Sequence, residues 1–409
     1  MILNSTLALA LRNVRRQGPR SIATLAAIAA GVAGLILAGG FVQDIFIQLG
    51  EAIIHSQTGH IQITAKGFTE GKNRNPEAYL IKNAHEIQEK ISASSPRVTQ
   101  TTARLSFSGT LNNGKRDLGI VGEGIQPDAE RTLGSHMRFS SGRALSETDH
   151  DAMIVGMGVA NSLGLRIGDR VTLVIALPSG ALNTQDFELV GIFESFSKEF
   201  DARAVRIPLA TAQKLADTSA CHMIVVTLDK TDATTSTVKS IKEKLLGEGL
   251  EVVPWHLLSD FYEKTVQLYD RQFGVLRLIT LLMVLLSVAN SVNMSLFERT
   301  REFGTMKALG NTSTTIFRLV LTESFCLGAI GAALGIILGC ILALCISAVG
   351  ISMPPPPNST LPYTALIRLD STSVCSAGAI GCIACILASL VPARRASQLD
   401  ITEALRHGI

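Results

Sequence analysis

The chain is best interpreted outward from Glu298-Arg-Thr-Arg-Glu-Phe-Gly-Thr-Met-Lys-Ala-Leu-Gly310, a short charged stretch between two long apolar runs. Phe303, Met306 and Leu309 recur at intervals of three, which predicts a short amphipathic helix with one apolar stripe. Gly310 follows as a residue that favours the end of a helix. A short helix between two membrane spans could receive force from a soluble partner. A tight, solvated turn is the alternative that this pattern leaves open.

The composition indicates a membrane protein with a sizeable soluble part. Of the 409 residues, 47% are hydrophobic and only 17% are charged, and the mean hydropathy is +0.32. The net charge of +3 is small, and no basic block is interleaved with aromatic residues. A nucleic-acid partner is therefore not expected.

Four long apolar runs predict four transmembrane helices, because each could cross roughly 30 Å of hydrocarbon. We place them at residues 21–43, 273–297, 315–349 and 371–393. A cleaved signal peptide is the competing interpretation of the first run, but its apolar core would normally be shorter, about 7–15 residues. The third run is longer than a bilayer needs, so we expect it to tilt or to project from one face.

The segments outside these runs complete the predicted architecture. Residues 1–20 carry four arginines and no acidic residue, which predicts a cytoplasmic amphipathic helix on the membrane surface. Mixed strand and helix patterns in residues 44–270 predict a large external α+β domain with two lobes. Residues 350–370 are predicted to form a short external loop. The cytoplasmic parts are then the loop at residues 298–314 and the tail at residues 394–409.

The orientation follows from the short segments that flank the spans, because lysine and arginine are concentrated within residues 1–20, 298–314 and 394–409. The positive-inside rule therefore places both termini in the cytoplasm. Within the predicted external domain, Asn112-Asn113-Gly114 predicts a hairpin turn. Ser259 predicts the N-cap of a helix that runs directly into the second span. Cys221 stands alone in this part, so no internal disulfide is expected and a labelling reagent outside the cell should reach it.

Three motifs resemble chemical sites without meeting their requirements. The segment Gly109-Thr-Leu-Asn-Asn-Gly-Lys-Arg116 matches GxxxxGK, but Arg116 replaces the magnesium ligand and the context is strand–turn–strand. His55 and His60 have no zinc-site spacing and are expected on the surface. Cys382-Ile-Ala-Cys385 lies within a span and is expected to pack a helix. We therefore expect no catalytic residue, no metal site and no directly bound cofactor.

Small residues and one acid mark the third span. Gly331, Gly335 and Gly339 form a GxxxG row, which lets helix backbones approach closely. Packing within this chain and a seam between two chains both remain open. Glu323 is the one acidic residue inside a span, near its cytoplasmic end, where water or Arg318 could reach it. A proton-coupled carrier would hold acids near the midplane, so we do not expect a proton relay.

The order of these features, together with two motifs, resembles the FtsX-like permease superfamily. These proteins are the membrane subunits of MacB-type and lipoprotein-releasing (LolC/LolE-type) ABC transporters. One motif is the Arg-Glu-Phe-Gly-Thr-Met-Lys-Ala-Leu-Gly loop, and the other is the tail Pro392-Ala-Arg-Arg-Ala396 followed by Ile401-Thr-Glu-Ala-Leu-Arg406. The segment from Ile154 to Val171 also resembles the external domain of that family.

The resemblance implies that a separate cytoplasmic ABC ATPase dimer binds two permease chains, identical or different. ATP is then used by that partner and not by this chain. The opening stretch corresponds to the family's coupling helix, which would contact the ATPase. By position, the contact residues are Arg299, Arg301, Glu302, Phe303, Gly304, Met306, Lys307, Ala308, Leu309 and Gly310.

The resemblance further implies a multi-pass protein of the plasma (inner) membrane, in contact with lipids and with a periplasmic chaperone or adaptor. The size and layout are most similar to the lipoprotein-releasing subunits, which implies release of lipoproteins or other lipid-linked cargo towards the outer membrane. Alternatives are a MacB-like efflux permease, an FtsX-like regulator of an external cell-wall hydrolase, and a membrane-anchored binding protein without an ATPase.

Overall fold

The computed structural model describes residues 18–71, 76–354 and 363–398. The predictions for residues 1–17, for part of the 350–370 loop and for the tail beyond residue 398 lie outside these ranges. The chain forms two compact units. Of the described residues, the helical unit comprises 18–46, 266–352 and 364–398, and the α+β unit comprises 47–71, 76–265, 353–354 and 363.

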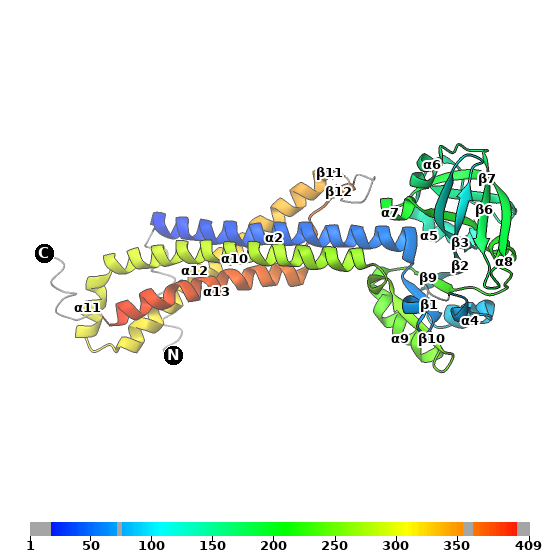
Figure 1. Ribbon diagram of the computed structural model, residues 1–409. Helices are drawn as coiled ribbons and strands as arrows, with labels where there is room; N and C mark the ends of the chain where they lie inside the picture. The colour runs from blue at the N-terminus through cyan, green and yellow to red at the C-terminus, as the bar shows by residue number, and fades with distance from the viewer. Residues whose placement is uncertain (1–17, 72–75, 355–362, 399–409) are drawn as a thin grey trace. The chain divides into compact units, whose positions relative to one another are not determined.

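Among the described residues, four helices are long and apolar enough to cross a membrane (Figure 1). They are α2 (Gly18–Ile53), α10 (Asp260–Glu298), α12 (Ser313–Val349) and α13 (Ser371–Ser397). All four extend beyond the predicted spans, because the helix continues past the end of each apolar run. Ser259 caps α10 as predicted, since its Oγ accepts a hydrogen bond from the Tyr262 N–H at 3.3 Å.

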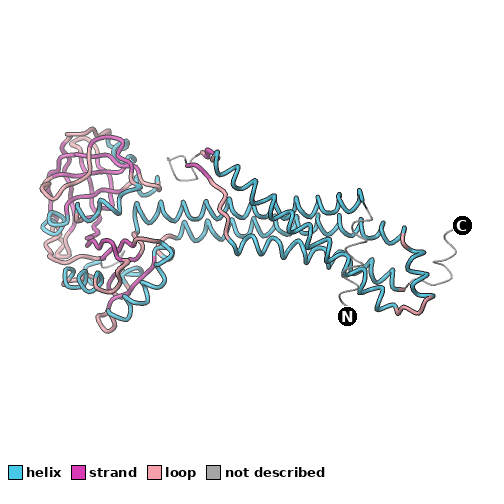
Figure 2. Tube along the Cα trace, turned by 180° about the vertical axis from the view of Figure 1, so that it is seen from behind, coloured by secondary structure: helices cyan, strands magenta, loops and turns pink. Residues whose placement is uncertain are grey.

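The four helices lie side by side in both views (Figures 1 and 2). Their apolar side chains form one core. Ile28 and Val32 of α2 lie in this core with Val288 of α10. In water, burial of one such side chain stabilises a fold by about 1.5–3 kcal/mol. Within lipid this hydrophobic contribution is absent, and close van der Waals contact between the helices stabilises the packing instead.

Asp44, which we expected to begin the external domain, instead lies fully buried on α2. Its carboxylate accepts hydrogen bonds from Arg368 Nε and from the Leu366 N–H, both at 2.9 Å. The segment that leads into α13 is thereby fastened to α2. A buried carboxylate requires such partners.

The α+β unit is built on a ten-stranded mixed sheet of order β10-β1-β9-β2-β3-β8-β5-β7-β4, in which β6 pairs with β2 and β7. The strands are β1 (Ile61–Ala65), β2 (Val98–Asn112), β3 (Asp117–Ile125), β4 (Arg138–Gly142), β5 (Ala152–Gly156), β6 (Arg170–Ala176), β7 (Leu182–Glu194), β8 (Ala204–Pro208), β9 (Met223–Leu228) and β10 (Leu250–Pro254). Two further strands, β11 (Ile351–Met353) and β12 (Tyr363–Ala365), pair with each other.

Short helices cover the sheet. They are η1 (Ile54–Thr58), α3 (Phe68–Gly71), η2 (Pro76–Tyr79), α4 (Ala84–Ser92), α5 (Pro127–Leu133), η3 (Gly134–His136), α6 (Met157–Leu163), α7 (Lys198–Asp201), α8 (Leu209–Leu215), η4 (Thr231–Ala233), α9 (Thr234–Lys244) and η5 (Trp255–Leu257).

The predicted α+β class and the two lobes agree with two large apolar cores. One core gathers side chains of β5, β6, β7 and α8, and the other gathers those of β1, β9, β10, α4 and α9. The predicted hairpin is confirmed, because β2 and β3 pair in antiparallel register from Arg104↔Ile125 to Asn112↔Asp117. The GxxxxGK segment therefore lies on strand–turn–strand, as expected. The strands β4 and β8 were not predicted.

The prediction that Cys221 is accessible to labelling is wrong. Its side chain is 1% exposed, because its backbone pairs with Ile81 ahead of β9 and buries the thiol. Burial raises the pKa of Cys221 to about 12. The reactive thiolate is thus scarce at neutral pH.

His60 is also buried, which contradicts the expectation of a surface histidine. Its Nδ1 accepts a hydrogen bond from the Leu228 N–H at 3.2 Å, and its Nε2 lies 3.2 Å from Thr231 Oγ1. Thr231 in turn donates to Glu51 at 2.5 Å. Burial lowers the pKa of His60 to about 4. The neutral imidazole therefore joins β1 to the turn after β9.

Acidification is expected to weaken the α+β unit through His60. Its folded pKa lies below the unfolded value near 6.5, so its contribution is complete above pH 6.5 and is lost as pH falls towards 4. Between pH 7 and pH 5 the loss is about 2 kcal/mol. Urea unfolding of the purified chain, followed by fluorescence of its only tryptophan, Trp255, measures this loss as the pH-dependent difference between wild type and His60→Gln.

The comparison with His60→Gln is needed because Asp201 acts with the opposite sign. Burial raises the pKa of Asp201 to about 6, so this group favours the folded unit as pH falls. Both proteins contain Asp201, and its effect cancels in the difference. A difference between the two proteins that does not change with pH would contradict the assignment to His60.

Candidate functional site

The predicted short helix is present as α11 (Thr300–Ala308), between α10 and α12. Gly310 ends the turn in a left-handed conformation with φ of 91°, and its N–H donates to the Lys307 carbonyl at 2.9 Å. A residue with a side chain would be strained at this φ. The stretch is therefore helical, and the alternative of a simple turn is excluded.

The apolar stripe is only partly buried. Phe303 is fully buried in the core of the helical unit, whereas Leu309 is 79% exposed. Met306 lies between these extremes. The helix ends at Ala308, so the backbone at Leu309 no longer follows the helical repeat and its side chain does not share the buried side with Phe303.

Arg299 holds α11 in place. Its Nη1 donates to Glu323 Oε2 at 2.7 Å and its Nε donates to Glu302 Oε2 at 2.9 Å. Its guanidinium also lies 5.1 Å from the centroid of the Phe303 ring. With only 12% of its side chain exposed, Arg299 positions the helix rather than presenting a charge.

Glu323 is therefore paired with Arg299 and not with Arg318, the partner that the sequence suggested. Arg318 lies only five residues away on the same helix, but its side chain is exposed. The pairing fastens the start of α11 to α12. The buried carboxylate is thus held by a cation at 2.7 Å.

The exposed surface of α11 and of the turn after it carries charged, apolar and small residues. The residues that we predicted to contact a partner and that are exposed are Arg301, Glu302, Ala308, Leu309 and Gly310. Phe303 and Gly304 are buried, and Arg299, Met306 and Lys307 are half-buried. The predicted contact set thus divides into an exposed surface and an inner set that holds the helix.

The glycine row of α12 lies against α2 of the same chain. A Cβ at Gly331 would come within 2.9 Å of Ile28, and one at Gly335 within 2.8 Å of the Ala29 carbonyl oxygen. A Cβ at Gly339 would lie 3.1 Å from the Ala33 Cα. On α13, Cys385 is buried, and a Cβ at Gly328 would come within 2.9 Å of its Cβ.

A buried charge network, which sequence reasoning missed, lies in the α+β unit. Arg104 is 1% exposed and donates from Nε and Nη2 to the two carboxylate oxygens of Glu130, at 2.6 and 2.8 Å. Its Nη1 donates to the Gln57 carbonyl at 2.6 Å. Arg206 donates to the Ser56 carbonyl at 3.3 Å and pairs with Glu123 at 3.0 Å.

This network binds the carbonyl end of η1, which directly continues α2, to the sheet. Burial disfavours the charge on Glu123, but Arg104 and Arg206 outweigh that effect and lower its pKa. The carbonyl end of a helix is the end that attracts cations. No group of three or more metal-binding side chains occurs among the residues that the structure describes.

Comparison with known proteins identifies two family domains in this chain. Residues 21–244 match the MacB-like periplasmic core domain, and residues 274–401 match the FtsX-like permease C-terminal domain. Similar proteins include the lipoprotein-releasing system transmembrane protein LolC of Neisseria meningitidis, which is 24% identical over 97% of this chain and 97% of its own length.

The macrolide export ATP-binding/permease protein MacB of Hyphomonas neptunium is 26% identical, over 73% of this chain and 45% of its own length. Among solved structures, the periplasmic region of MacB from Actinobacillus actinomycetemcomitans aligns with 53% of this chain and 95% of its own, at 16% identity and a TM-score of 0.37. The two family domains, which together cover most of the chain, carry the assignment. The protein is a multi-pass inner-membrane protein and belongs to the MacB/FtsX/LolC family of ABC transporter permeases.

Proposed function

We propose that this permease releases lipoproteins or other lipid-linked cargo from the inner membrane towards the outer membrane. The observation that carries the proposal is the end-to-end similarity to LolC, which extends over 97% of both chains. The similarity to MacB covers 45% of the Hyphomonas neptunium protein and 58% of the Shewanella protein. A MacB-like efflux permease and an FtsX-like regulator of a cell-wall hydrolase remain the alternative functions.

In the proposed mechanism, a separate ATPase dimer binds the cytoplasmic side of two permease chains. Both termini and α11 face the cytoplasm, and the α+β unit faces the periplasm. The ATPase contacts the exposed surface of α11, and Arg299 transmits its movement to α12 through Glu323. The continuous helices α2 and α10 carry the motion across the membrane.

Cargo class can be tested by photocrosslinking in cells. A photoreactive amino acid is placed at several exposed positions of the α+β unit, and the products are probed for lipoproteins and for cell-wall hydrolases. Lipoprotein adducts that accumulate when the partner ATPase cannot hydrolyse ATP support the proposal. Adducts with a hydrolase alone would instead establish the regulatory function.

Changing the exposed surface of α11 is expected to uncouple ATP hydrolysis from transport. Leu309→Asp replaces an exposed apolar group and changes none of the residues that contact Arg299. Glu302→Lys replaces a half-exposed carboxylate and also removes its hydrogen bond with Arg299. We expect at least a tenfold loss of cargo release at an unchanged amount of protein in the membrane. The assay measures cargo release and ATPase rate with the reconstituted complex.

Arg318→Ala is the matched control, because Arg318 is an exposed cation near the same end of α12. It should retain release and ATPase rates close to those of wild type. If Leu309→Asp and Glu302→Lys both release cargo at the wild-type rate, α11 is not the coupling helix.

A further inference from the structure

The central strand β2 has an unpaired stretch along one edge. On one side it pairs with β3 from Arg104 to Asn112. On the other side it pairs with β9 up to Arg104 and with β6 only from Gly109. Within the described residues, no strand therefore pairs with residues 105–108 on that side. Four residues of extended chain span about 13 Å, at 3.2–3.4 Å per residue.

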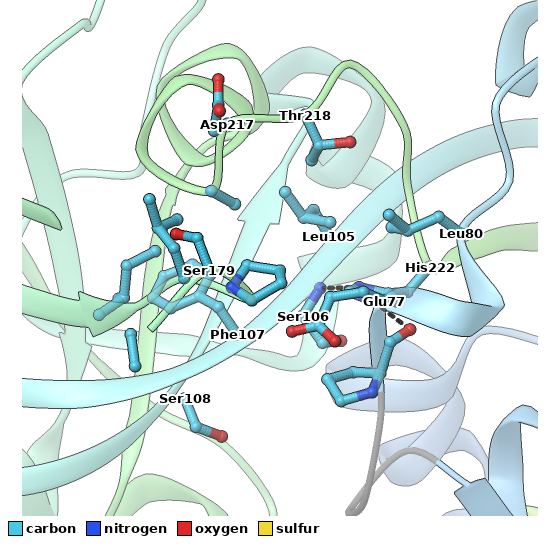
Figure 3. Close-up of a pocket in the computed structure, with 16 residues that line it drawn as sticks. Glu77, Leu80, Leu105, Ser106, Phe107, Ser108, Ser179, Asp217, Thr218 and His222 are labelled. Atoms are coloured by element: carbon cyan, nitrogen blue, oxygen red, sulfur yellow. Dashed lines mark hydrogen bonds between the residues drawn. The ribbon is translucent and has the colours of Figure 1, made fainter. Parts of the chain in front are cut away.

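His222 closes one end of this gap. The backbone N–H of His222 donates to the Arg104 carbonyl at 2.9 Å. Its imidazole Nδ1 accepts a hydrogen bond from the Ser106 backbone N–H at 3.2 Å. Its Nε2 lies 3.1 Å from the Pro76 carbonyl, so the imidazole donates there as the neutral Nε2–H tautomer (Figure 3). Alternate residues of a strand direct their backbone groups to the same edge. The Ser106 carbonyl and the Ser108 N–H therefore point into the gap.

The gap opens into a pocket of about 330 Å³ (Figure 3). Leu80, Leu105 and Phe107 contribute apolar side chains to its wall, while Ser179 and Thr218 contribute hydroxyl groups. This volume is at the lower end of the range for ligand sites, and an apolar wall with a few polar groups is their usual character. An apolar side chain and a short piece of backbone would fill it.

The charged side chains that line the pocket are acidic. Glu77 and Asp217 line it and are exposed, and none of its sixteen lining residues is lysine or arginine. His222 adds no positive charge, because burial lowers its pKa. Among the residues that the structure describes, the two carboxylates at the opening therefore favour a cationic group and disfavour a carboxylate or a phosphate.

We propose that this gap on β2 binds an extended peptide segment that adds a short strand to the sheet. The segment places an apolar side chain against Leu105 and Phe107 and a lysine or arginine near Glu77 and Asp217. Backbone hydrogen bonds provide the affinity in strand addition, and side-chain pockets provide the specificity. This inference concerns a peptide site and does not depend on the identity of the transported cargo.

The test is a selection of phage-displayed random heptapeptides on the purified full-length chain in nanodiscs. We expect enrichment of peptides that combine an apolar residue with lysine or arginine. One enriched peptide is then synthesised with a fluorescein label, and its affinity is measured by fluorescence anisotropy. Methylation of single backbone nitrogens of this peptide should weaken binding at least tenfold at one or two positions, because strand pairing needs its N–H groups.

Three variants separate a built site from unspecific adhesion. Ser179→Trp, at an exposed turn, fills the pocket and should abolish binding. The double variant Glu77→Gln and Asp217→Asn should weaken binding at least tenfold. Asparagine suits the left-handed conformation of Asp217, where φ is 50°, so this change removes the charge without backbone strain. Leu246→Ser, which is 86% exposed and is not a lining residue, is the control and should bind as wild type.

Two results would overturn the proposal. One is a selection without enrichment, or with peptides that bind Ser179→Trp as well as wild type. The other is an enriched peptide whose N-methylated forms all keep their affinity, which would mean that no strand is added. Neither result affects the crosslinking test of cargo class.

Discussion

Replacing Glu130 with alanine is expected to lower the free energy of unfolding of the α+β unit by about 3–5 kcal/mol. Arg104 is 1% exposed, and Glu130 accepts two of its hydrogen bonds. Without that carboxylate, the nearest acid is Glu123, whose oxygen lies 3.6 Å from Arg104 Nη1. A buried cation that has lost its bidentate partner is among the costliest defects in a protein interior.

Urea unfolding followed by Trp255 fluorescence measures this effect, since Trp255 lies in the same unit. Asp128→Ala is the matched control on the same helix, because Asp128 pairs with Arg131 in solvent and should cost less than about 1 kcal/mol. The double variant Arg104→Met and Glu130→Leu removes both charges and should recover most of the stability. If Glu130→Ala and Asp128→Ala lower the free energy of unfolding equally, the role of the buried pair is contradicted.

The same network has a consequence for transport. Arg104 and Arg206 donate to the carbonyls of Gln57 and Ser56, at the end of the helix that continues α2. In the proposed mechanism, a movement of α2 reaches the sheet through these two contacts. The network would then transmit force as well as stabilise the unit.

Much of the fold could be predicted from the sequence, because the signals are local. Long apolar runs gave the four helices, and Asn112-Asn113-Gly114 gave the hairpin between β2 and β3. The charged stretch before Gly310, with its regularly spaced apolar residues, predicted the short helix α11. In each case, the residues that cause the structure lie within the segment that they specify.

The missed features depend on residues far apart in the sequence. Arg104 and Arg206 appear in the sequence as ordinary polar positions of two strands, and only the sheet brings both to the carbonyl end of η1. His60 is buried because the turn after β9 covers it. The gap on β2 exists because β9 ends before β6 begins to pair. No periodicity within a single segment encodes any of these contacts.

The stripe of Phe303, Met306 and Leu309 was predicted, but the different burial of its members was not. The interval of three from Met306 to Leu309 continued the stripe, but the helix ends one residue earlier. Element ends are difficult to place from sequence. Leu309, which was predicted to contact a partner, is thus 79% exposed.

The second large effect is expected from Gly335→Ala, which should destabilise the helical unit by about 1–3 kcal/mol. A Cβ at this position would lie 2.7 Å from the Val32 Cβ and 2.8 Å from the Ala29 carbonyl oxygen. Backbone atoms cannot give way as a flexible side chain does, so α2 and α12 must separate. The loss is measured as a shift in the thermal midpoint of the detergent-solubilised chain, detected by fluorescence size-exclusion chromatography.

Gly34→Ala on α2 is the matched control, because a Cβ there meets no atom within 4 Å. Both changes replace glycine by alanine within a helix and gain a similar helix propensity of about 1 kcal/mol, so their difference isolates the steric cost at Gly335. The pair also addresses whether the small residues pack one chain or two. If Gly335→Ala is tolerated while Gly34→Ala dissociates a dimer in crosslinking, the seam between chains lies on α2, and the contact between α2 and α12 is not what requires glycine.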